Sequence, residues 1–178
     1  MRAIDEIIVH CTATRAEWWA TRTVNQKVAE IRAWHVRDRG WSDIGYHYLI
    51  DRNGKVAPGR PIGRNGAHTK GHNSGTIGIA LFGGHGSSEH DAFLENFTPK
   101  QDAALRDLIA KLSAQYGIAK VSGHNEYAAK ACPGFNVTDW YGSGASAKTP
   151  EPPQPTTTKS PSASWWTVIA ALFGGPKK

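Results

Sequence analysis

Two capping boxes, each a Thr followed three residues later by a Gln, fix where this chain begins its helices. In such a box the Thr side chain accepts a backbone N–H of the first turn, and the Gln side chain accepts the N–H of the Thr. The first box, Thr23 with Gln26, predicts a helix that stops at Gly40. Its apolar positions recur at helical spacing, namely Val24, Val28, Ile31 and His35.

The second box joins Thr98 to Gln101 and has Pro99 at the first helical position. Proline suits that position because its fixed φ is helical and its missing N–H would have no partner there. We therefore expect a second helix that begins after Thr98 and stops at Gly117. Its apolar side is Leu105, Leu108, Ile109, Leu112 and Tyr116.

Strand patterns surround these helices. Segments rich in β-branched or aromatic residues occupy 6–14, 46–57, 76–83 and 118–124. Within 46–57, the dipeptide Asn53-Gly54 predicts a hairpin, with both residues in left-handed turn conformations. Strands that alternate with two helices predict an α/β (α+β) fold, a central mixed β-sheet flanked by helices, with the functional site in loops at the strand ends.

The composition changes near residue 143. Residues 144–164 contain five Pro with many Ser and Thr and no large apolar side chain, which predicts a linker in a flexible C-terminal tail. Residues 1–143 then form the folded domain, and 165–178 form a short apolar and cationic segment. That segment is far shorter than the roughly 20 apolar residues needed to span a bilayer.

Charge and cysteine content narrow the class of protein. The net charge is +6, which favours anionic partners such as nucleic acid, membrane surfaces or envelope polymers. Two Cys cannot form a disulfide framework, and no apolar signal segment opens the chain. We therefore expect synthesis in a reducing cytoplasm, without a signal peptide.

Three residues that can bind a metal stand at the predicted strand ends. His10 ends the first strand, His124 follows the last, and Cys132 returns on the next loop. Adjacent strands would bring the two His together. Two imidazoles and a thiolate are a tetrahedral ligand set for zinc, and a fourth position left for water is typical of catalytic sites. Zinc lowers the pKa of that water to about 7.

Five segments, read in order, carry a resemblance to a known family: "VHCTAT", "WHVRDRGWSDIGYHYLIDRNGKV", "GAHTKGHNSGTIGIALFGG", "NFTPKQ" and "GHNEYAAKACPGF". Together they resemble the type 2 N-acetylmuramoyl-L-alanine amidases, a family that includes phage endolysins and the peptidoglycan recognition proteins. The resemblance implies Zn²⁺ as cofactor, held by His10, His124 and Cys132. It also implies that Tyr46 and Lys130 are catalytic.

The activity implied by this resemblance is hydrolysis of the amide between N-acetylmuramic acid and L-alanine in peptidoglycan. Lys130 would place a positive charge near the metal ligands. Tyr46 would donate a hydrogen bond to the reacting oxygen or assist the proton that goes to the leaving amine. The resemblance further implies a phage endolysin that lyses its host, made in the host cytoplasm and acting on periplasmic or wall peptidoglycan.

Other residues receive weaker assignments. His68 matches a His of the family motif and is expected to line the substrate groove, and His47 has a weaker claim to the same role. Cys11 should point to the opposite face of the sheet from His10, which suits a small buried hydrophobe. The Gly-rich segment 82–90 lacks the spacing of a phosphate loop and is interpreted as a rim. The remaining His are expected to be packing or surface residues.

Two other functions compete with an amidase. A non-catalytic peptidoglycan-binding module occurs among the recognition proteins, although the complete ligand trio argues against it. A regulator that binds RNA polymerase is the other, because a phage lysozyme of this family does so in addition to its hydrolysis.

Two functions are possible for the segment 165–178. Two Trp, an apolar run and a terminal Lys pair suit an interfacial anchor on anionic membranes. The alternative is that its apolar residues dock on the protein body or on another copy of the chain.

Overall fold

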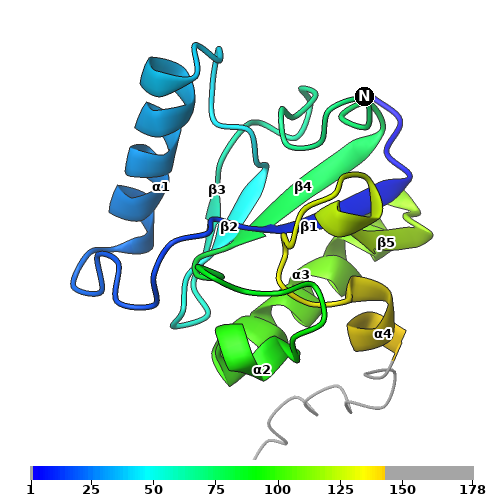
Figure 1. Ribbon diagram of the computed structural model, residues 1–178. Helices are drawn as coiled ribbons and strands as arrows, with labels where there is room; N and C mark the ends of the chain where they lie inside the picture. Colours follow the sequence, from blue (N-terminus) through cyan, green and yellow to red (C-terminus); the bar gives the residue numbers. More distant parts are fainter. Residues whose placement is uncertain (1, 143–178) are drawn as a thin grey trace, which may run out of the picture. The chain divides into compact units, whose positions relative to one another are not determined.

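A computed structural model describes residues 2–142, and the predicted linker 144–164 and terminal segment 165–178 lie outside these residues. The described part is built on a five-stranded sheet in the order β3-β2-β4-β1-β5 (Figure 1). The strands are β1 (Glu6–Cys11), β2 (Tyr48–Ile50), β3 (Val56–Pro58), β4 (Thr76–Leu81) and β5 (Lys120–Gly123). All pairs are parallel except β2 with β3, so the predicted mixed sheet is confirmed.

Both capping boxes form as predicted. Helix α1 (Val24–Ala33) begins after Thr23, and α3 (Pro99–Tyr116) begins after Thr98. The first helix continues as a π-helical turn, Trp34–Asp38, and Gly117 ends α3 in the left-handed conformation. Two short helices, α2 (Phe93–Asn96) and α4 (Val137–Gly142), had no clear sequence signal.

The central strands β1 and β4 are almost completely buried. On one face of the sheet, Ile7, Val9 and Cys11 pack in a core with residues of α3, including Leu105 and Ile109. Cys11 is therefore a buried core residue, as expected. Each such apolar side chain contributes roughly 1.5–3 kcal/mol through removal from water.

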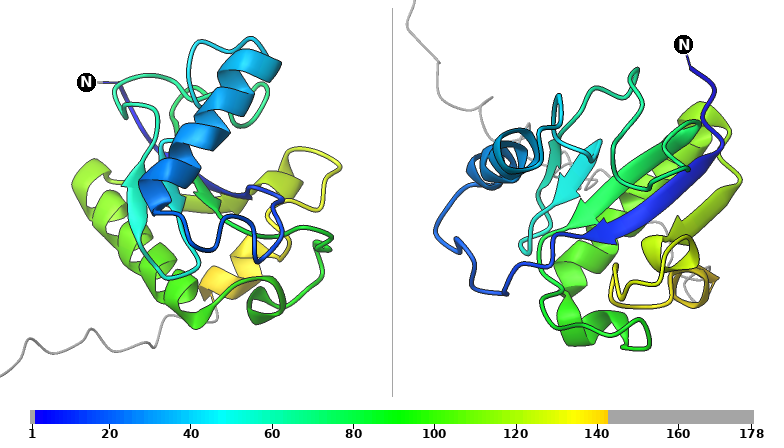
Figure 2. Two further views of the ribbon diagram at one scale, coloured as in Figure 1. Left: turned by 90° about the vertical axis from the view of Figure 1, so that its left-hand side faces the viewer. Right: turned by 45° about the horizontal axis from the view of Figure 1, so that its top comes forward.

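Helix α1 packs on the opposite face through Val24, Val28 and Ile31, against Leu49 of β2 and Ala57 of β3. The helix therefore lies over the β2–β3 side of the sheet, whereas α3 lies on the far side (Figures 1 and 2). Residues alternate between faces along a strand, so His10 lies on the α1 face. Over β1 and β5 this face is covered by loops rather than by α1, which leaves room for a site.

The hairpin forms at the predicted place, but the predicted backbone of its turn is wrong in one respect. Gly54 has a φ of +84°, whereas Asn53 does not adopt a positive φ. The Gly54 N–H donates to the carbonyl of Asp51, and the Asp51 N–H donates to that of Lys55. A turn closed in this way needs one left-handed residue instead of two, and glycine adopts that conformation without a steric penalty.

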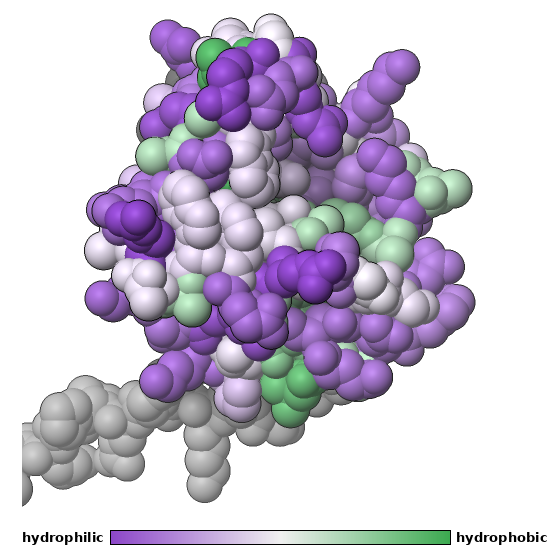
Figure 3. All heavy atoms as spheres, turned by 60° about the vertical axis from the view of Figure 1, so that its left-hand side comes forward, coloured by the Kyte–Doolittle hydropathy of each residue, from purple (hydrophilic) through white to green (hydrophobic). Residues whose placement is uncertain are grey.

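The surface on the α1 side is mainly hydrophilic, with apolar side chains in small groups (Figure 3). Among residues 2–142, no helix combines the length and apolar character that crossing a membrane requires.

Candidate functional site

Parallel pairing of β1 with β5 brings two of the predicted ligands together. Val9 is in register with Gly123, so the next residues along the two strands are His10 and His124. Their rings lie 4.6 Å apart, centre to centre. One ligand atom each from His10, His124 and Cys132 all lie within 4.8 Å of one another. Residues separated by 122 positions thus converge, as the sequence predicted.

The spacing and chemistry of this trio fit a tetrahedral metal ion. Nδ1 of His10 lies 3.8 Å from Sγ of Cys132. Two ligands of one zinc ion, with bonds of about 2.0–2.1 Å to nitrogen and about 2.3 Å to sulfur, lie about 3.6 Å apart. An ion could therefore be held with little movement of these side chains.

The other ring nitrogen of His10 is engaged behind the trio. Nε2 of His10 lies 3.1 Å from Nδ1 of His68, and Nε2 of His68 lies 3.4 Å from Oγ1 of Thr76. The Thr76 hydroxyl donates to the carbonyl of His72 at 2.7 Å. The His72 carbonyl can only accept, so the Thr76 hydroxyl uses its hydrogen there and accepts a hydrogen bond from Nε2 of His68. Nδ1 of His68 then carries no hydrogen and is an acceptor. His10 then donates from Nε2 to His68, which leaves the lone pair of its Nδ1 directed to the ligand trio.

Glycines make room for His68. A Cβ at Gly66 or Gly78 would lie 2.3 Å or 2.5 Å from ring atoms of His68. The loop is fixed from the other side by Asn73, whose Oδ1 accepts the N–H groups of His68 and Thr69 at 2.8 and 2.9 Å. His68 is 8% exposed and therefore has one well-defined position.

The loop that carries Cys132 is held by polar contacts to its backbone. Asn125 donates to the carbonyl of Phe135 at 3.3 Å, and Asn96 donates to that of Gly134 at 3.2 Å. Gly134 has a φ of +94°, and a Cβ there would lie 2.3 Å from Oγ of Ser87. The Cys11 N–H donates to Sγ of Cys132 at 3.3 Å, which holds the sulfur at the end of β1.

The protonation states of the trio suit metal binding. Burial holds the pKa of His10 well below its usual value, and repulsion from the protonated forms of His68 and His124 and from Lys130 lowers it further. Burial and the charge of Lys130 lower the pKa of His124. Both rings are therefore neutral at pH 7. A hydrogen bond with Cys11 and burial raise the pKa of the Cys132 thiol. The Cys132 thiol therefore loses its proton only when a metal cation binds the sulfur.

The two predicted catalytic residues lie at the same place. The rings of Tyr46 and His10 are 5.3 Å apart, and burial raises the pKa of the Tyr46 hydroxyl, which is therefore protonated. Lys130 is exposed and lies near enough to His10 and His124 for its charge to lower the pKa of both.

A pocket of about 610 Å³ opens beside the trio. It is lined by His68 and His124, by Lys130, and by Arg39, Trp41, Ala67, Thr69, Lys70, Asn73, Tyr127 and Ala128. The predicted groove position of His68 thus agrees with the geometry, although contact with substrate stays a prediction.

His47 lies elsewhere. It is 1% exposed and does not line this pocket. Its Nδ1 accepts the N–H of Gly78 at 3.0 Å, and its Nε2 donates to the carbonyl of Arg64 at 3.0 Å. This geometry favours a structural role that ties β2 to β4, and a contact with substrate stays an untested prediction.

Sequence reasoning missed several residues of the site. Thr69 and Thr76 contact His68, at 3.0 and 3.4 Å, and Arg39 and Lys70 line the pocket. Thr69 and Thr76 lie in the segment 66–78, and its high content of Gly, Thr and His could have indicated them. No local pattern identified the two cations.

Comparisons with known proteins found a matching family model, related sequences and related solved structures. The model of the family described as N-acetylmuramoyl-L-alanine amidase (Amidase_2) matches residues 1–135. The endolysins of Klebsiella phage KP32 and Escherichia phage T7 are each 42% identical over 137 residues, which cover 77% of this chain and 85% of each relative. The solved structure of the N-acetylmuramoyl-L-alanine amidase LysC from Clostridium intestinale URNW has a TM-score of 0.62 and 27% identity. It covers 80% of this chain, which in turn covers 85% of LysC.

Proposed function

Because the chain belongs to the N-acetylmuramoyl-L-alanine amidase family, we propose that His10, His124 and Cys132 hold a catalytic zinc ion for its hydrolysis of peptidoglycan. The protein is an amidase of the endolysin type and acts on the peptidoglycan of the cell wall. The bond cleaved is the amide between N-acetylmuramic acid and L-alanine. The observation that carries the zinc proposal is the convergence of three ligand atoms within 4.8 Å.

Zinc held by this trio would act as a Lewis acid on the amide and would activate water for attack. The protein's own groups supply the remainder of the chemistry. Lys130 keeps a positive charge beside the site, where it stabilises negative charge that develops on the amide oxygen. Tyr46 stays protonated, so its hydroxyl can donate a hydrogen bond to that oxygen or pass a proton to the leaving amine.

The second candidate, a binding module without catalysis, has less support. Binding alone requires neither a complete ligand trio nor a protonated Tyr and a Lys gathered around it. In this chain all five are present, and they approach one another from β1, the segment before β2 and the loop after β5.

Two further partners stay predictions. RNA polymerase binding rests only on the resemblance, and a pulldown of polymerase with the purified protein would test it. Membrane contact rests on the composition of residues 165–178, which lie outside the described residues. Synthesis in the host cytoplasm is likewise an expectation.

Digestion of purified peptidoglycan tests the proposed function directly. We expect new amino groups of L-alanine without new reducing ends of sugars. A strong chelator should abolish the release, and added zinc should restore it. Reducing ends in place of L-alanine termini would contradict amidase activity, whereas undiminished release by verified metal-free protein would contradict only the zinc site.

A further inference from the structure

Three aromatic rings form a stack at the segment that joins β1 to α1. The buried ring of Phe82 lies 5.9 Å from the ring of Trp18 at an angle of 17°, and the ring of Trp18 lies 4.9 Å from that of Trp19 at 4°. Trp18 also contacts the ring of Trp34 at 5.3 Å. The stack therefore runs from the core to the surface, where its outermost residue, Trp19, is 38% exposed.

The backbone holds Trp19 in an unfavourable conformation. Its φ is +49°, in the left-handed region that a bulky side chain rarely adopts. Hydrogen bonds of the turn stabilise this conformation, since the Arg22 N–H donates to the carbonyl of Trp19 at 2.8 Å. A large ring that is kept at the surface despite backbone strain is typical of a residue that serves in binding.

A pocket of about 360 Å³ opens beside the exposed ring. Trp18 is not part of its lining, so the pocket does not lie on the side of Trp19 that the stack covers. The lining consists of Trp19, Arg22, Gln26, Ala29 and Glu30. An aromatic ring is thus combined with side chains that form hydrogen bonds.

The polar side chains of this pocket supply both donors and acceptors. The guanidinium of Arg22 lies 5.8 Å from the ring centre of Trp19, and within residues 2–142 no ion pair includes it. Gln26 uses Oε1 in its capping box, and its amide NH₂ can donate. One carboxylate oxygen of Glu30 accepts Nε1 of Trp34 at 2.8 Å, so its second oxygen can accept from a ligand.

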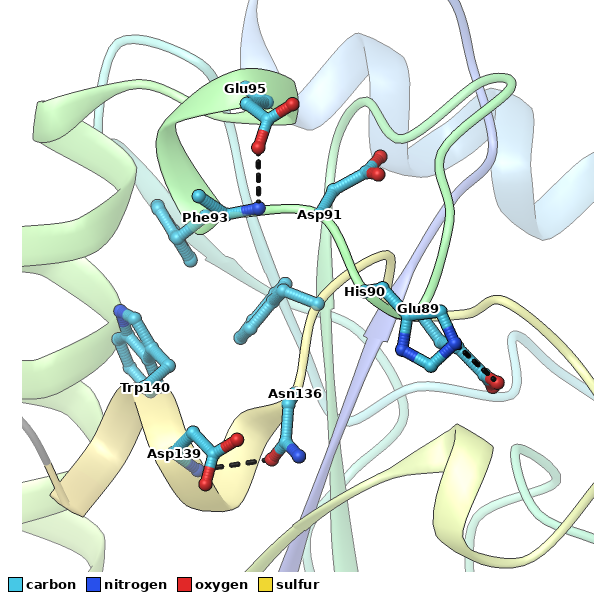
Figure 4. A pocket seen from close by; sticks show the side chains of 10 residues that line it. Glu89, His90, Asp91, Phe93, Glu95, Asn136, Asp139 and Trp140 are labelled. Atoms are coloured by element: carbon cyan, nitrogen blue, oxygen red, sulfur yellow. Dashed lines mark hydrogen bonds and ion pairs between the residues drawn. The ribbon is translucent and has the colours of Figure 1, made fainter.

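The charges of this pocket balance, because Arg22 is opposed by Glu30. Three cations, in contrast, line the pocket beside the ligand trio. A third pocket, beside α2 and α4, is lined by the acidic residues Glu89, Asp91, Glu95 and Asp139 (Figure 4). Of these three pockets, the one at Trp19 therefore suits a neutral ligand best.

The glycan strand of peptidoglycan is a neutral ligand of this kind. The lactyl carboxyl of each N-acetylmuramic acid that bears a stem is consumed in an amide, so these sugars carry no charge. One face of a sugar ring presents C–H groups, which pack on the negative face of an aromatic ring, and the hydroxyl groups need both donors and acceptors. Resting on the proposed function, we infer that Trp19, Arg22 and Glu30 form a second subsite, which binds sugar rings of the glycan strand away from the ligand trio.

This glycan subsite is separate from the pocket beside the trio but connected to the site by packing. The described linings of the two pockets share no residue. Trp18 and Tyr46 pack against the same core cluster, and the ring of Tyr46 lies 5.3 Å from that of His10. Because the glycan strand repeats its disaccharide, one strand can occupy both places, which raises the apparent affinity for the polymer without altering the reaction.

Binding of chitohexaose, a soluble oligomer of N-acetylglucosamine, tests the glycan subsite without a peptide or a scissile bond. Isothermal titration calorimetry compares the full-length wild type with Trp19→Ala, Trp19→Phe and Arg22→Gln. The matched control is Tyr141→Ala, which removes another aromatic side chain, 36% exposed, on α4. Circular dichroism and zinc content of each variant establish that its fold and metal site are intact.

We expect Trp19→Ala to lower the affinity for chitohexaose about tenfold and Arg22→Gln to lower it about threefold. Trp19→Phe should retain most of the affinity because it keeps an aromatic face, and Tyr141→Ala should match the wild type.

Steady-state hydrolysis provides the second readout. The substrates are soluble glycan strands that bear peptide stems and a muramoyl peptide with a single sugar, which is too short to reach the glycan subsite. Trp19→Ala should raise the KM for the strands about threefold to tenfold with kcat little changed, since the lost contact binds ground state and transition state alike. The KM for the single-sugar substrate should not change.

Three results would overturn the inference while leaving the amidase function intact. The first is a wild type that does not bind chitohexaose, and the second is equal binding by the wild type and Trp19→Ala. The third is an equal rise in KM for both substrates in Trp19→Ala. Failure of the wild type to release L-alanine termini would instead contradict the proposed function, whereas the titration with chitohexaose would still decide whether Trp19 binds sugar.

Discussion

Nε2 of His10 lies 3.1 Å from Nδ1 of His68, and this contact determines which nitrogen of His10 faces the ligand trio. His10 is 1% exposed, so its ring cannot exchange this partner for water. The predicted groove residue His68 therefore also has a positioning role, since it orients a ligand from behind.

Replacement of His68 should weaken zinc binding. His68→Phe keeps a ring of similar size but removes the acceptor for Nε2 of His10, and loss of such an outer partner typically lowers metal affinity about 10- to 100-fold. Titration against a competing chelator measures this, with His85→Phe, at an exposed position, as the control. Unchanged affinity in His68→Phe would show that the contact does not orient the ligand.

Variants of a metal ligand and variants of the catalytic residues should differ in whether they retain zinc. Cys132→Ser should lose both bound zinc and activity, because the thiolate is one of three ligands. Lys130→Ala and Tyr46→Phe should retain zinc but lower kcat by roughly 10²- to 10³-fold. Metal analysis and kinetics of the same preparations are the measurements. Loss of zinc in either helper variant would mean that the roles are assigned wrongly.

Removal of one partner of the buried ion pair between α1 and the hairpin should strongly destabilise the fold. Nζ of Lys27 lies 2.7 Å from Oδ1 of Asp51, and the two residues are 4% and 2% exposed. Lys27→Met leaves the Asp51 carboxylate buried without its partner, which should lower the free energy of unfolding by about 3–5 kcal/mol. Urea denaturation measures the change.

Two further variants make that test specific. Lys27→Met combined with Asp51→Asn should recover much of the loss, because no unpaired charge is then buried. Arg37→Gln, which removes an exposed ion pair, should leave stability unchanged. A double variant as unstable as Lys27→Met would argue that packing rather than charge accounts for the loss.

Stability should fall on mild acidification because of two buried histidines. His35 and His47 each accept a backbone N–H at Nδ1, from Gly45 and Gly78. Burial is the main cause that lowers the pKa of each to about 4, from about 6.5 in the unfolded chain. Below about pH 6.5 the unfolded state then binds more protons, so stability is complete above that pH and decreases toward pH 4.

Each histidine should contribute a slope of at most about 1.4 kcal/mol per pH unit. Asparagine can accept the same N–H through its side-chain oxygen without titrating. His47→Asn should therefore flatten the pH dependence of the free energy of unfolding between pH 6.5 and 4. An unchanged slope in this variant would exclude His47 as a source of the acid sensitivity.

The C-terminal segment is predicted to contact anionic membranes. Residues 144–178 contain four Lys and one Glu, and so hold +3 of the net +6. Full-length protein should bind anionic liposomes, more weakly at high salt, and protein that ends at Gly142 should not. Hydrolysis of purified peptidoglycan should stay nearly equal. Equal liposome binding by both proteins would refute the anchor, whereas lost hydrolysis would favour docking on the body.

The sequence by itself determined the elements whose causes are local. A capping box spans three residues, so the starts of α1 and α3 could be predicted from Thr23 and Thr98. Glycine is favoured in left-handed backbone, so the end of α3 at Gly117 could be predicted as well. The position of His10 and His124 at strand ends followed from these elements, and Cys132 could be placed on the loop that follows the last strand.

Only the tertiary structure decided which groups meet across long stretches of chain. His10 and His68 are 58 residues apart, and Lys27 and Asp51 are 24 apart, so neither contact has a periodic signature in the sequence. The cations that line the pocket beside the trio, Arg39, Lys70 and Lys130, likewise come from separate loops that only the tertiary structure brings together. Such contacts depend on which faces the strands and helices bury, and that choice is made by packing of the whole core rather than by any one segment.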